Sequence, residues 1–323
     1  MDELLLKTAQ ELSSRQAGGH GDRWGVLTGG VDAVLGNLKM IVEKSEWWDI
    51  GLVDKVDIQA AVADGEPSCF PLLYTGQKKG ASKTGAVSLY VQNQETKELA
   101  LWSAYPFFGD GVEIEGVVDQ LLLHPNRVEA TLEIGMENGT LITAFDPFFC
   151  QSRALYRLGQ VYRFSLSALA YSMNPAGPIE KRIDDPDEIR RYRAREAWAE
   201  RHGQWTKENE LAALAAWQPQ TPEDLAPIRF DIGGGTVLIP SSNGFSDDAL
   251  YLGEVVQVKT DAARMLETNF WRVDVVVLRS EVMGTLTLPI YVSENLLEGE
   301  WRPRVGEHVT GNAWLQAYPK AVL

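Results

Sequence analysis

Aromatic and basic side chains gather in one short stretch of the sequence, directly after a run of alternating apolar and polar residues. The stretch contains Phe145, Phe148, Phe149, Arg153, Tyr156 and Arg157. On the face of a β-barrel, aromatic rings of this kind could stack on nucleobases while the arginines contact phosphates. The pattern favours a second interpretation, in which Phe145 and one of the other two phenylalanines fill a core. The stretch is therefore both a candidate binding site and a candidate core segment.

A second basic cluster lies in a helix that is predicted over residues 186–202. Its members are Arg190, Arg191, Arg193 and Arg195. Phosphates of a nucleic acid would suit these guanidinium groups, but four carboxylates of the same helix neutralise much of their charge. We therefore favour a solvated helix with ion pairs at i,i+3 and i,i+4 spacing. On another side of the helix lie Ile189, Tyr192 and Ala199, which we expect to be packed.

No stretch of the sequence carries a recognisable catalytic or metal-binding pattern. The histidines are His20, His124, His202 and His308. None has the i,i+4 partner of a helical metal pair. Residues 76–85 fail as a phosphate-binding P-loop because Ser82 stands where glycine must precede the lysine. Cys69 and Cys150 predict reduced, at least partly buried thiols. We predict no catalytic residue, no metal site and no cofactor.

The formal net charge is −15, and the acidic excess is spread along the chain. It amounts to −5, −3, −3 and −4 over residues 1–111, 112–179, 180–226 and 227–323. No segment is basic, so none has the electrostatic footprint that drives binding to a phosphate backbone. An evenly spread excess is typical of a surface that maintains solubility. A nucleic-acid partner is thus disfavoured, and a protein partner is preferred.

Membrane and export signals are not recognisable in the sequence. No apolar run approaches the roughly 18 residues that a membrane-spanning helix needs. The first residues, MDELLLKTAQELSS, are acidic and lack the basic flank and cleavage site of a signal peptide. We therefore predict a soluble, cytoplasmic protein with no membrane partner.

From residue 86 onward, apolar residues recur mostly with a period of two, which predicts strands. A hairpin is expected at residues 87–106. Further strands in the first half are expected at about 113–122, 127–134 and 140–146, before a long strand at about 161–171. Strands in the second half are expected at about 229–232, 236–239, 251–258, 270–278 and 285–291, before a last one near the C-terminus.

Two long strands share a design that predicts an internal duplication. Each has a glycine twelve residues before a tyrosine, and the pairs are Gly159 with Tyr171 and Gly306 with Tyr318. Gly116 also matches Gly253, and the Thr-Leu pair at 140 matches the one at 285 in the same order. A strand interrupted by glycine, further strands and a short irregular piece before the last strand suit a small Greek-key barrel. The pattern resembles the oligonucleotide/oligosaccharide-binding (OB) barrel class in outline.

The predicted fold is mainly β with α segments (α+β), with two similar Greek-key, OB-like barrels. The expected regions are a helical or irregular N-terminal region at 1–85, a first barrel at 86–178, a helical connector at 179–226 and a second barrel at 227–323. In the connector, Asp185 and Pro186 predict the start of a helix and Gly203 predicts its end. Shorter helices are expected at about 206–217 and from residue 221.

These features favour a binding function. We expect a non-enzymatic protein, a protein–protein interaction or assembly component that acts through its barrel faces. One alternative is binding of single-stranded nucleic acid through the OB-like barrels. Another is an enzyme with a dispersed site between the barrels. The barrel class does not decide among the three, because one fold supports many functions.

Overall fold

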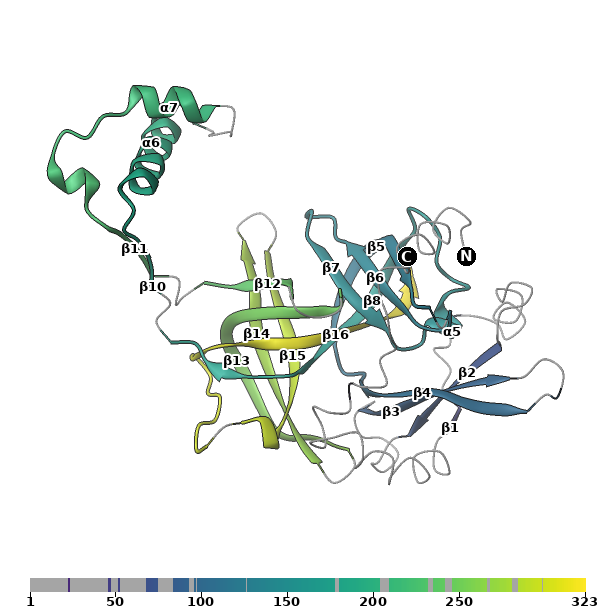
Figure 1. The fold of residues 1–323 in the computed structure, drawn as a ribbon. Coiled ribbons are helices and arrows are strands. Elements are labelled where there is room, and N and C mark those ends of the chain that lie inside the picture. Colours follow the sequence, from purple (N-terminus) through teal and green to yellow (C-terminus); the bar gives the residue numbers. More distant parts are fainter. Residues whose placement is uncertain are drawn as a thin grey trace. The chain divides into compact units, whose positions relative to one another are not determined.

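The structure is a computed structural model of the 323-residue chain, and it is mainly β with few helices (Figure 1). It describes residues 23, 46–47, 52, 68–74, 84–92, 96, 98–125, 127–177, 180–203, 209–231, 235–241, 246–265, 268–280, 284–297 and 299–323. The helices expected near the N-terminus lie outside these residues. By their internal contacts, the described residues form two units, one within Met1–Pro175 and Thr236–Leu323 and the other within Ala176–Gly235.

A four-stranded antiparallel sheet comes first in the chain. Its strands, in spatial order, are β1 (Glu46–Trp47), β2 (Ser68–Tyr74), β3 (Thr84–Gln92) and β4 (Leu99–Phe108). β3 and β4 form the hairpin that the sequence predicts at 87–106. Val87 and Tyr105 are among the apolar side chains that these two strands bury. Although the sequence assigns this hairpin to the first barrel, its strands pair within the four-stranded sheet.

The next elements form the first of two similar strand sets. They are β5 (Val112–Leu123), β6 (Ala130–Gly135), β7 (Leu141–Asp146), the short helix α5 (Phe149–Ser152) and β8 (Val161–Ala170). β5, β6 and β7 form an antiparallel meander, and β8 returns to pair with the other edge of β5. Asp119 is an extra residue in β5, three positions after Gly116, and makes a β-bulge against β6.

The second strand set has the same order of elements. They are β13 (Asp248–Met265), β14 (Thr268–Ser280), β15 (Gly284–Ser293), the 3₁₀ turn η4 (Glu294–Leu296) and β16 (His308–Val322). Again three strands form a meander and the last strand returns to the first. A bulge at Val256 follows Gly253 by three positions. Two short strands complete this sheet, because β12 (Val237–Pro240) pairs with β13 and β9 (Asn174–Pro175) pairs with β16.

The last strands of the two sets join them. β8 and β16 pair antiparallel, with Ala168 opposite Leu315. β16 also pairs in parallel with β7, where Gln316 meets Phe145, and β8 pairs in parallel with β15. Hydrogen bonding therefore closes two rings of strands, β5-β6-β7-β16-β8 and β13-β14-β15-β8-β16. Each ring therefore contains one strand that belongs to the other set.

Two clusters of apolar side chains hold this arrangement together. The larger cluster joins both strand sets, with buried members such as Leu132, Phe164 and Ile290. The smaller cluster includes Phe107 from the four-stranded sheet and Trp314 from β16, so it connects that sheet to the joined strands. Because burial of apolar surface is the main favourable term in folding, a core shared in this way couples the two sets.

The second unit is built around α6 (Pro186–His202), which has the bounds that the sequence predicts. The Asp185 carboxylate accepts hydrogen bonds from two backbone amides of the first turn, and Gly203 ends the helix with a φ of 85°. α7 (Glu210–Ala216) packs on α6 and is followed by η3 (Pro222–Leu225). β10 (Glu180–Ile183) and β11 (Ile228–Asp231) form a two-stranded ribbon.

The buried side of α6 differs in part from the prediction. Ile189 is buried as expected, and Ala194 is the second buried residue of the helix. Tyr192 and Ala199 are only half-buried. The small side chain of Ala194 lets α7 approach closely, with Ala213 of α7 buried as well. This leaves the larger Tyr192 beside the helix contact instead of within it.

Candidate functional site

The structure buries the aromatic stretch that is the first binding candidate. Four of its side chains are at most 1% exposed, namely Phe145, Phe148, Phe149 and Tyr156. Phe145 packs edge-on against Tyr105, with ring centroids 5.0 Å apart, and Phe148 packs edge-on against Phe107 at 4.9 Å. Edge-to-face pairs of this kind stabilise a core. The four rings therefore offer no open face on which a nucleobase could stack.

The two arginines of the same stretch are also engaged in local structure. Arg153 is only 2% exposed. Arg157 is exposed, but its Nη1 donates to the carbonyl oxygens of Ala154 and Tyr156, at 2.8 and 2.9 Å. These bonds hold the turn that leads into β8. This environment suits a structural role for both guanidinium groups.

Asp146, which the sequence pattern does not mark as a functional residue, is the polar centre of this stretch. Its buried carboxylate accepts hydrogen bonds from the Phe148 amide at 2.8 Å, the Tyr156 hydroxyl at 2.6 Å and the Ser152 hydroxyl. Burial raises the pKa of Asp146 to about 6, and these three hydrogen bonds oppose the rise. The sequence signal was an Asp-Pro pair directly after a strand, which is typical of a turn. Asp146 thereby anchors α5.

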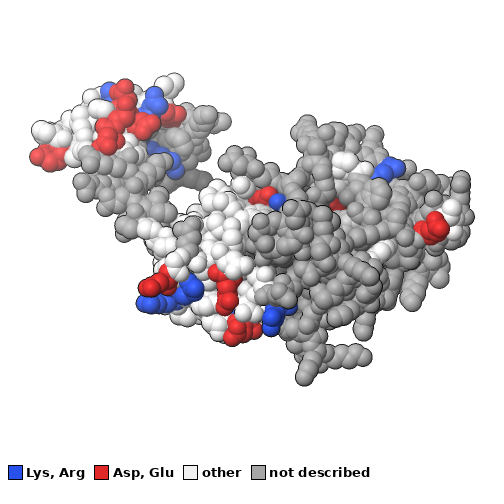
Figure 2. All heavy atoms as spheres, turned by 60° about the horizontal axis from the view of Figure 1, so that its bottom comes forward, with Lys and Arg blue, Asp and Glu red and all other residues white. Residues whose placement is uncertain are grey.

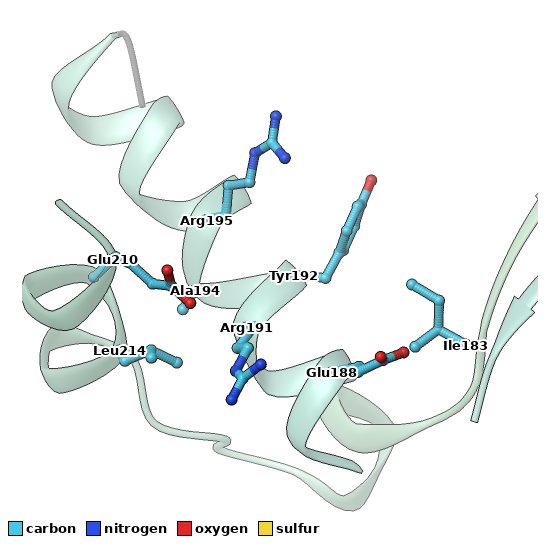
Figure 3. Close-up of a pocket in the computed structure, with 9 residues that line it drawn as sticks. Ile183, Glu188, Arg191, Tyr192, Ala194, Arg195, Glu210 and Leu214 are labelled. Atoms are coloured by element: carbon cyan, nitrogen blue, oxygen red, sulfur yellow. The ribbon is translucent and has the colours of Figure 1, made fainter. Parts of the chain in front are cut away.

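The arginine cluster of α6 borders a groove between α6 and α7, with a volume of about 300 Å³ (Figure 3). Its apolar lining consists of Ile183, Ala194, Ala213 and Leu214. The two alanines are buried at the contact between the helices, whereas Ile183 and Leu214 are half-buried. The groove thus has an apolar lining that is partly accessible to solvent.

Polar side chains border the same groove. Those of α6 are Glu188, Arg191, Tyr192 and Arg195, and Glu210 comes from α7. The α6 positions are spaced i, i+3, i+4 and i+7, which places them along one side of a helix. In Figure 3, Tyr192 and Arg195 project together from α6, whereas Arg191 lies nearer Glu188. Two of the four arginines singled out in the sequence therefore belong to the groove.

The four arginines have different surroundings. Arg193 forms the expected i,i+3 ion pair, with its Nη1 3.2 Å from Glu196. Partial burial, and then a hydrogen bond with Glu196, raise the pKa of Tyr192. Arg191 is exposed and, within the described part of the chain, makes no hydrogen bond or ion pair. Its guanidinium can therefore bind an incoming acceptor without first breaking an internal contact.

The groove is lined by apolar side chains, two carboxylates, two guanidinium groups and a tyrosine. Its side chains include no serine, cysteine or histidine that could act as a nucleophile or an activating base. Across the described residues, no group of three or more His, Cys, Asp and Glu side chains could hold a metal ion. What the groove offers is an apolar contact area next to guanidinium groups, which is a binding chemistry.

Surface charge on the described residues is mixed. On the face that Figure 2 shows, acidic and basic side chains are interspersed, and the described residues form no broad positive patch there. None of the helices in the described ranges is long and apolar enough to cross a membrane. Comparisons of the chain with known protein families, with curated proteins and with solved structures find no match.

Proposed function

We propose that this chain is a non-enzymatic binding protein, a component of a protein–protein interaction or an assembly. We further propose that the groove between α6 and α7 docks a segment of its partner. The observation that carries the proposal is the lining of the groove, in which an apolar area lies beside the guanidinium groups of Arg191 and Arg195. Arginine and tyrosine are enriched at protein interfaces, where binding energy concentrates in a few such residues.

The proposed occupant is a short peptide segment with an aliphatic side chain next to a carboxylate. A groove of about 300 Å³ accommodates a few side chains. The planar fork of a guanidinium group matches a carboxylate with two parallel hydrogen bonds. Glu188 and Glu210 line the same groove, so the positive potential is confined to the guanidinium groups. This arrangement favours a single carboxylate over a polyanion such as nucleic acid.

At the level of the fold, we propose that the two strand sets are duplicated OB-like barrels fused through β8 and β16. The matching order of elements supports the duplication, and so do the matched glycines. Gly116 and Gly253 each precede a bulge by three residues. At both positions an added Cβ would meet a backbone carbonyl oxygen of the neighbouring strand, that of Gly135 or Val276. Glycine at both places permits a close approach of two backbones.

The turns before the last strands give further support. Arg157-Leu158-Gly159-Gln160 precedes β8, and Arg304-Val305-Gly306-Glu307 precedes β16. Both glycines have a positive φ, 72° and 88°. The residues that end β7 and β15 also match, because Asp146 and Ser293 each accept a hydrogen bond from the amide two positions later. Local features of this kind are expected to persist after a duplication, even where the sequence identity between the two copies is low.

Site-directed crosslinking tests the docking proposal. A photo-crosslinking amino acid is placed at Leu214, which lines the groove, or at Leu211, which lies on the same helix and is 82% exposed. We expect crosslinks to a partner from position 214 and not from position 211. The captured partner is then purified and titrated against the wild-type chain. Equal crosslinking at the two positions, or no saturable binding by the purified partner, contradicts docking in the groove.

A labelled single strand of nucleic acid provides the second arm of the test. Because the described surface has no broad positive patch on the face shown and the net charge is −15, few phosphates could be neutralised. We expect only weak binding at an ionic strength of about 0.15 M. Submicromolar affinity for the strand under these conditions would favour nucleic acid over a protein partner.

A further inference from the structure

A row of apolar side chains crosses the outer face of the first strand set. Val161 of β8 pairs with Val117 of β5. Val117 also pairs with Gly135 of β6, which pairs in turn with Leu141 of β7. Paired residues of neighbouring strands point to the same side of a sheet, so these residues lie in one line, the outer row. Leu141 is 53% exposed and Val161 is 39% exposed, so the outer row faces solvent.

Two carboxylates lie beside the outer row on the same face. Asp119 is the bulge residue of β5, and its carboxylate occupies the space that Gly135 leaves open, because an added Cβ on that glycine would collide with it. Glu133 lies two residues before Gly135 in β6, on the same side of the strand. Burial, and then the charge of Asp119, raise the pKa of Glu133. Within the described ranges, neither carboxylate accepts a hydrogen bond or forms an ion pair.

The second strand set has charged side chains where the outer row has apolar ones. The six residue pairs that join β5 to β8 recur with constant spacing between β13 and β16. Glu254 and His308 therefore stand where Val117 and Val161 stand in the first set. Glu254 forms an ion pair with Arg279, whose Nη2 lies 3.0 Å from the carboxylate. This face of the second set thus pairs its negative charge within the chain.

The two carboxylates beside the outer row differ from their counterparts in the same way. Because the bulges of β5 and β13 are equivalent, Val256 stands where Asp119 stands, and Asp274 stands where Glu133 stands. Nε of Arg272 lies 2.7 Å from Oδ1 of Asp274, so this carboxylate has a cation of its own. Of the two sets, as far as the structure describes them, only the first combines an open apolar row with carboxylates that lack a cation.

We propose that the outer row is a second docking surface, for a partner segment that carries one lysine or arginine between aliphatic side chains. The cation lies at the carboxylates of Asp119 and Glu133, where it replaces their mutual repulsion with attraction. The aliphatic side chains pack on Val117, Val161 and Leu141, and burial of this apolar surface supplies affinity. Charge complementarity fixes the register of the segment and disfavours a polyanion.

This surface is independent of the proposed α6–α7 docking groove. The groove belongs to the unit within Ala176–Gly235, whereas the outer row belongs to the other unit. The two surfaces also select opposite charges, because the groove presents guanidinium groups and the outer row presents carboxylates. Loss of binding at one surface therefore leaves the proposal for the other intact.

Titration of the full chain with three short peptides tests the outer row. The probe is acetyl-Leu-Val-Lys-Val-Leu-amide. The matched peptides are the same sequence with Glu in place of Lys, and acetyl-Ser-Ser-Lys-Ser-Ser-amide. NMR spectra of a chain labelled at its leucine and valine methyl groups follow the binding. We expect saturable shifts of the Val117, Val161 and Leu141 signals with the probe, and at least about tenfold weaker binding of both matched peptides.

Variants with equal changes of charge separate the outer row from the net charge of the chain. Asp119→Asn with Glu133→Gln should weaken binding of the probe at least about tenfold. Glu200→Gln with Glu300→Gln removes two exposed carboxylates elsewhere and should stay close to the wild type. Leu141→Asn, which changes no charge, should weaken the probe as well.

The methyl spectrum of each variant first verifies that it is folded, and Leu141→Asn decides the test if the Asp119 and Glu133 variant is not. Three results would overturn the proposal. They are the absence of saturable shifts in the outer row, equal binding of the lysine and glutamate peptides, and an equal loss in the two charge variants.

Discussion

Ala168 and Leu315 lie opposite each other where β8 pairs with β16. Each stands nine residues after the glycine of its own turn, Gly159 or Gly306. Matched positions of the two strand sets therefore meet at one end of the β8–β16 ladder. We expect matched substitutions in the two sets to have matched effects.

Gly116→Ala and Gly253→Ala should each destabilise the protein by about 1–3 kcal/mol, the range for forcing extra atoms into a packed site. A Cβ at position 116 would lie 2.7 Å from the Gly135 carbonyl oxygen, and one at 253 would meet the Val276 carbonyl oxygen. Urea unfolding measures both losses. Gly177→Ala is the control, because a Cβ there meets no atom within 4 Å. If either strand variant behaves like Gly177→Ala, the two glycines do not have equivalent roles.

Asp146→Asn should become more stable relative to the wild type as the pH rises from about 4 to about 7. Burial raises the folded pKa of Asp146 from 3.8 to about 6, so the folded state binds this proton more tightly than the unfolded state. The stability that this proton provides is present below pH 4 and is lost as the pH rises through 6. A shift of about two units corresponds to a change on the order of 3 kcal/mol. The difference in unfolding free energy between variant and wild type is measured across this pH range. It checks both the sign and the size of the expected change.

Asp224→Asn provides a control of opposite sign. Hydrogen bonds from the backbone amides of Thr221 and Gln220 lower the pKa of Asp224. The stability that this carboxylate provides is present above its unfolded pKa and is lost as the pH falls through the folded pKa. Asp224→Asn should therefore be less stable than the wild type at neutral pH and approach it in acid. The same trend for both variants would contradict the buried-carboxyl account of Asp146.

Replacing Arg191 and Arg195 with Gln should weaken partner binding by at least about tenfold, which is about 1.4 kcal/mol. The melting temperature should change little, because exposed ion pairs contribute only about 0–1 kcal/mol each. Arg201→Gln on the same helix is the control, since Arg201 is exposed and lies outside the groove lining. Isothermal titration of the purified partner measures all three affinities. An equal loss for Arg201→Gln would mean that helix charge in general, and not the groove, governs binding.

Local signals in the sequence predicted some elements closely. The bounds of α6 follow from Asp185, Pro186 and Gly203, whose effects act within one helical turn. The hairpin of β3 and β4 follows from a period of two along a short segment. In both cases the residues that determine the structure are neighbours in the sequence.

Contacts between distant segments could not be predicted in the same way. Phe145 pairs with Gln316 only because β7 meets β16 in parallel, and neither residue carries a local signal of the other. The groove shows the same limit. The sequence pattern marks Arg191 and Arg195 of α6 as candidate binding residues, but the apolar lining of the groove includes Leu214 from α7. The approach of the two helices depends on the small side chains of Ala194 and Ala213. The helical period of α6 predicts Tyr192 on the packed side. It does not specify which neighbouring element covers that side, and the structure places Ala194 at the contact instead.

Partner binding in the groove is tested most directly by the affinity of the purified partner for Leu214→Asp, with Leu211→Asp as the matched control. Both variants introduce the same charge on α7, with Leu214→Asp inside the groove lining and Leu211→Asp outside it. Circular dichroism first verifies that both variants keep their helical content. We predict that Leu214→Asp weakens binding by at least about tenfold and that Leu211→Asp stays close to the wild type. Unchanged affinity for Leu214→Asp, or an equal loss for both variants, would contradict docking in the α6–α7 groove.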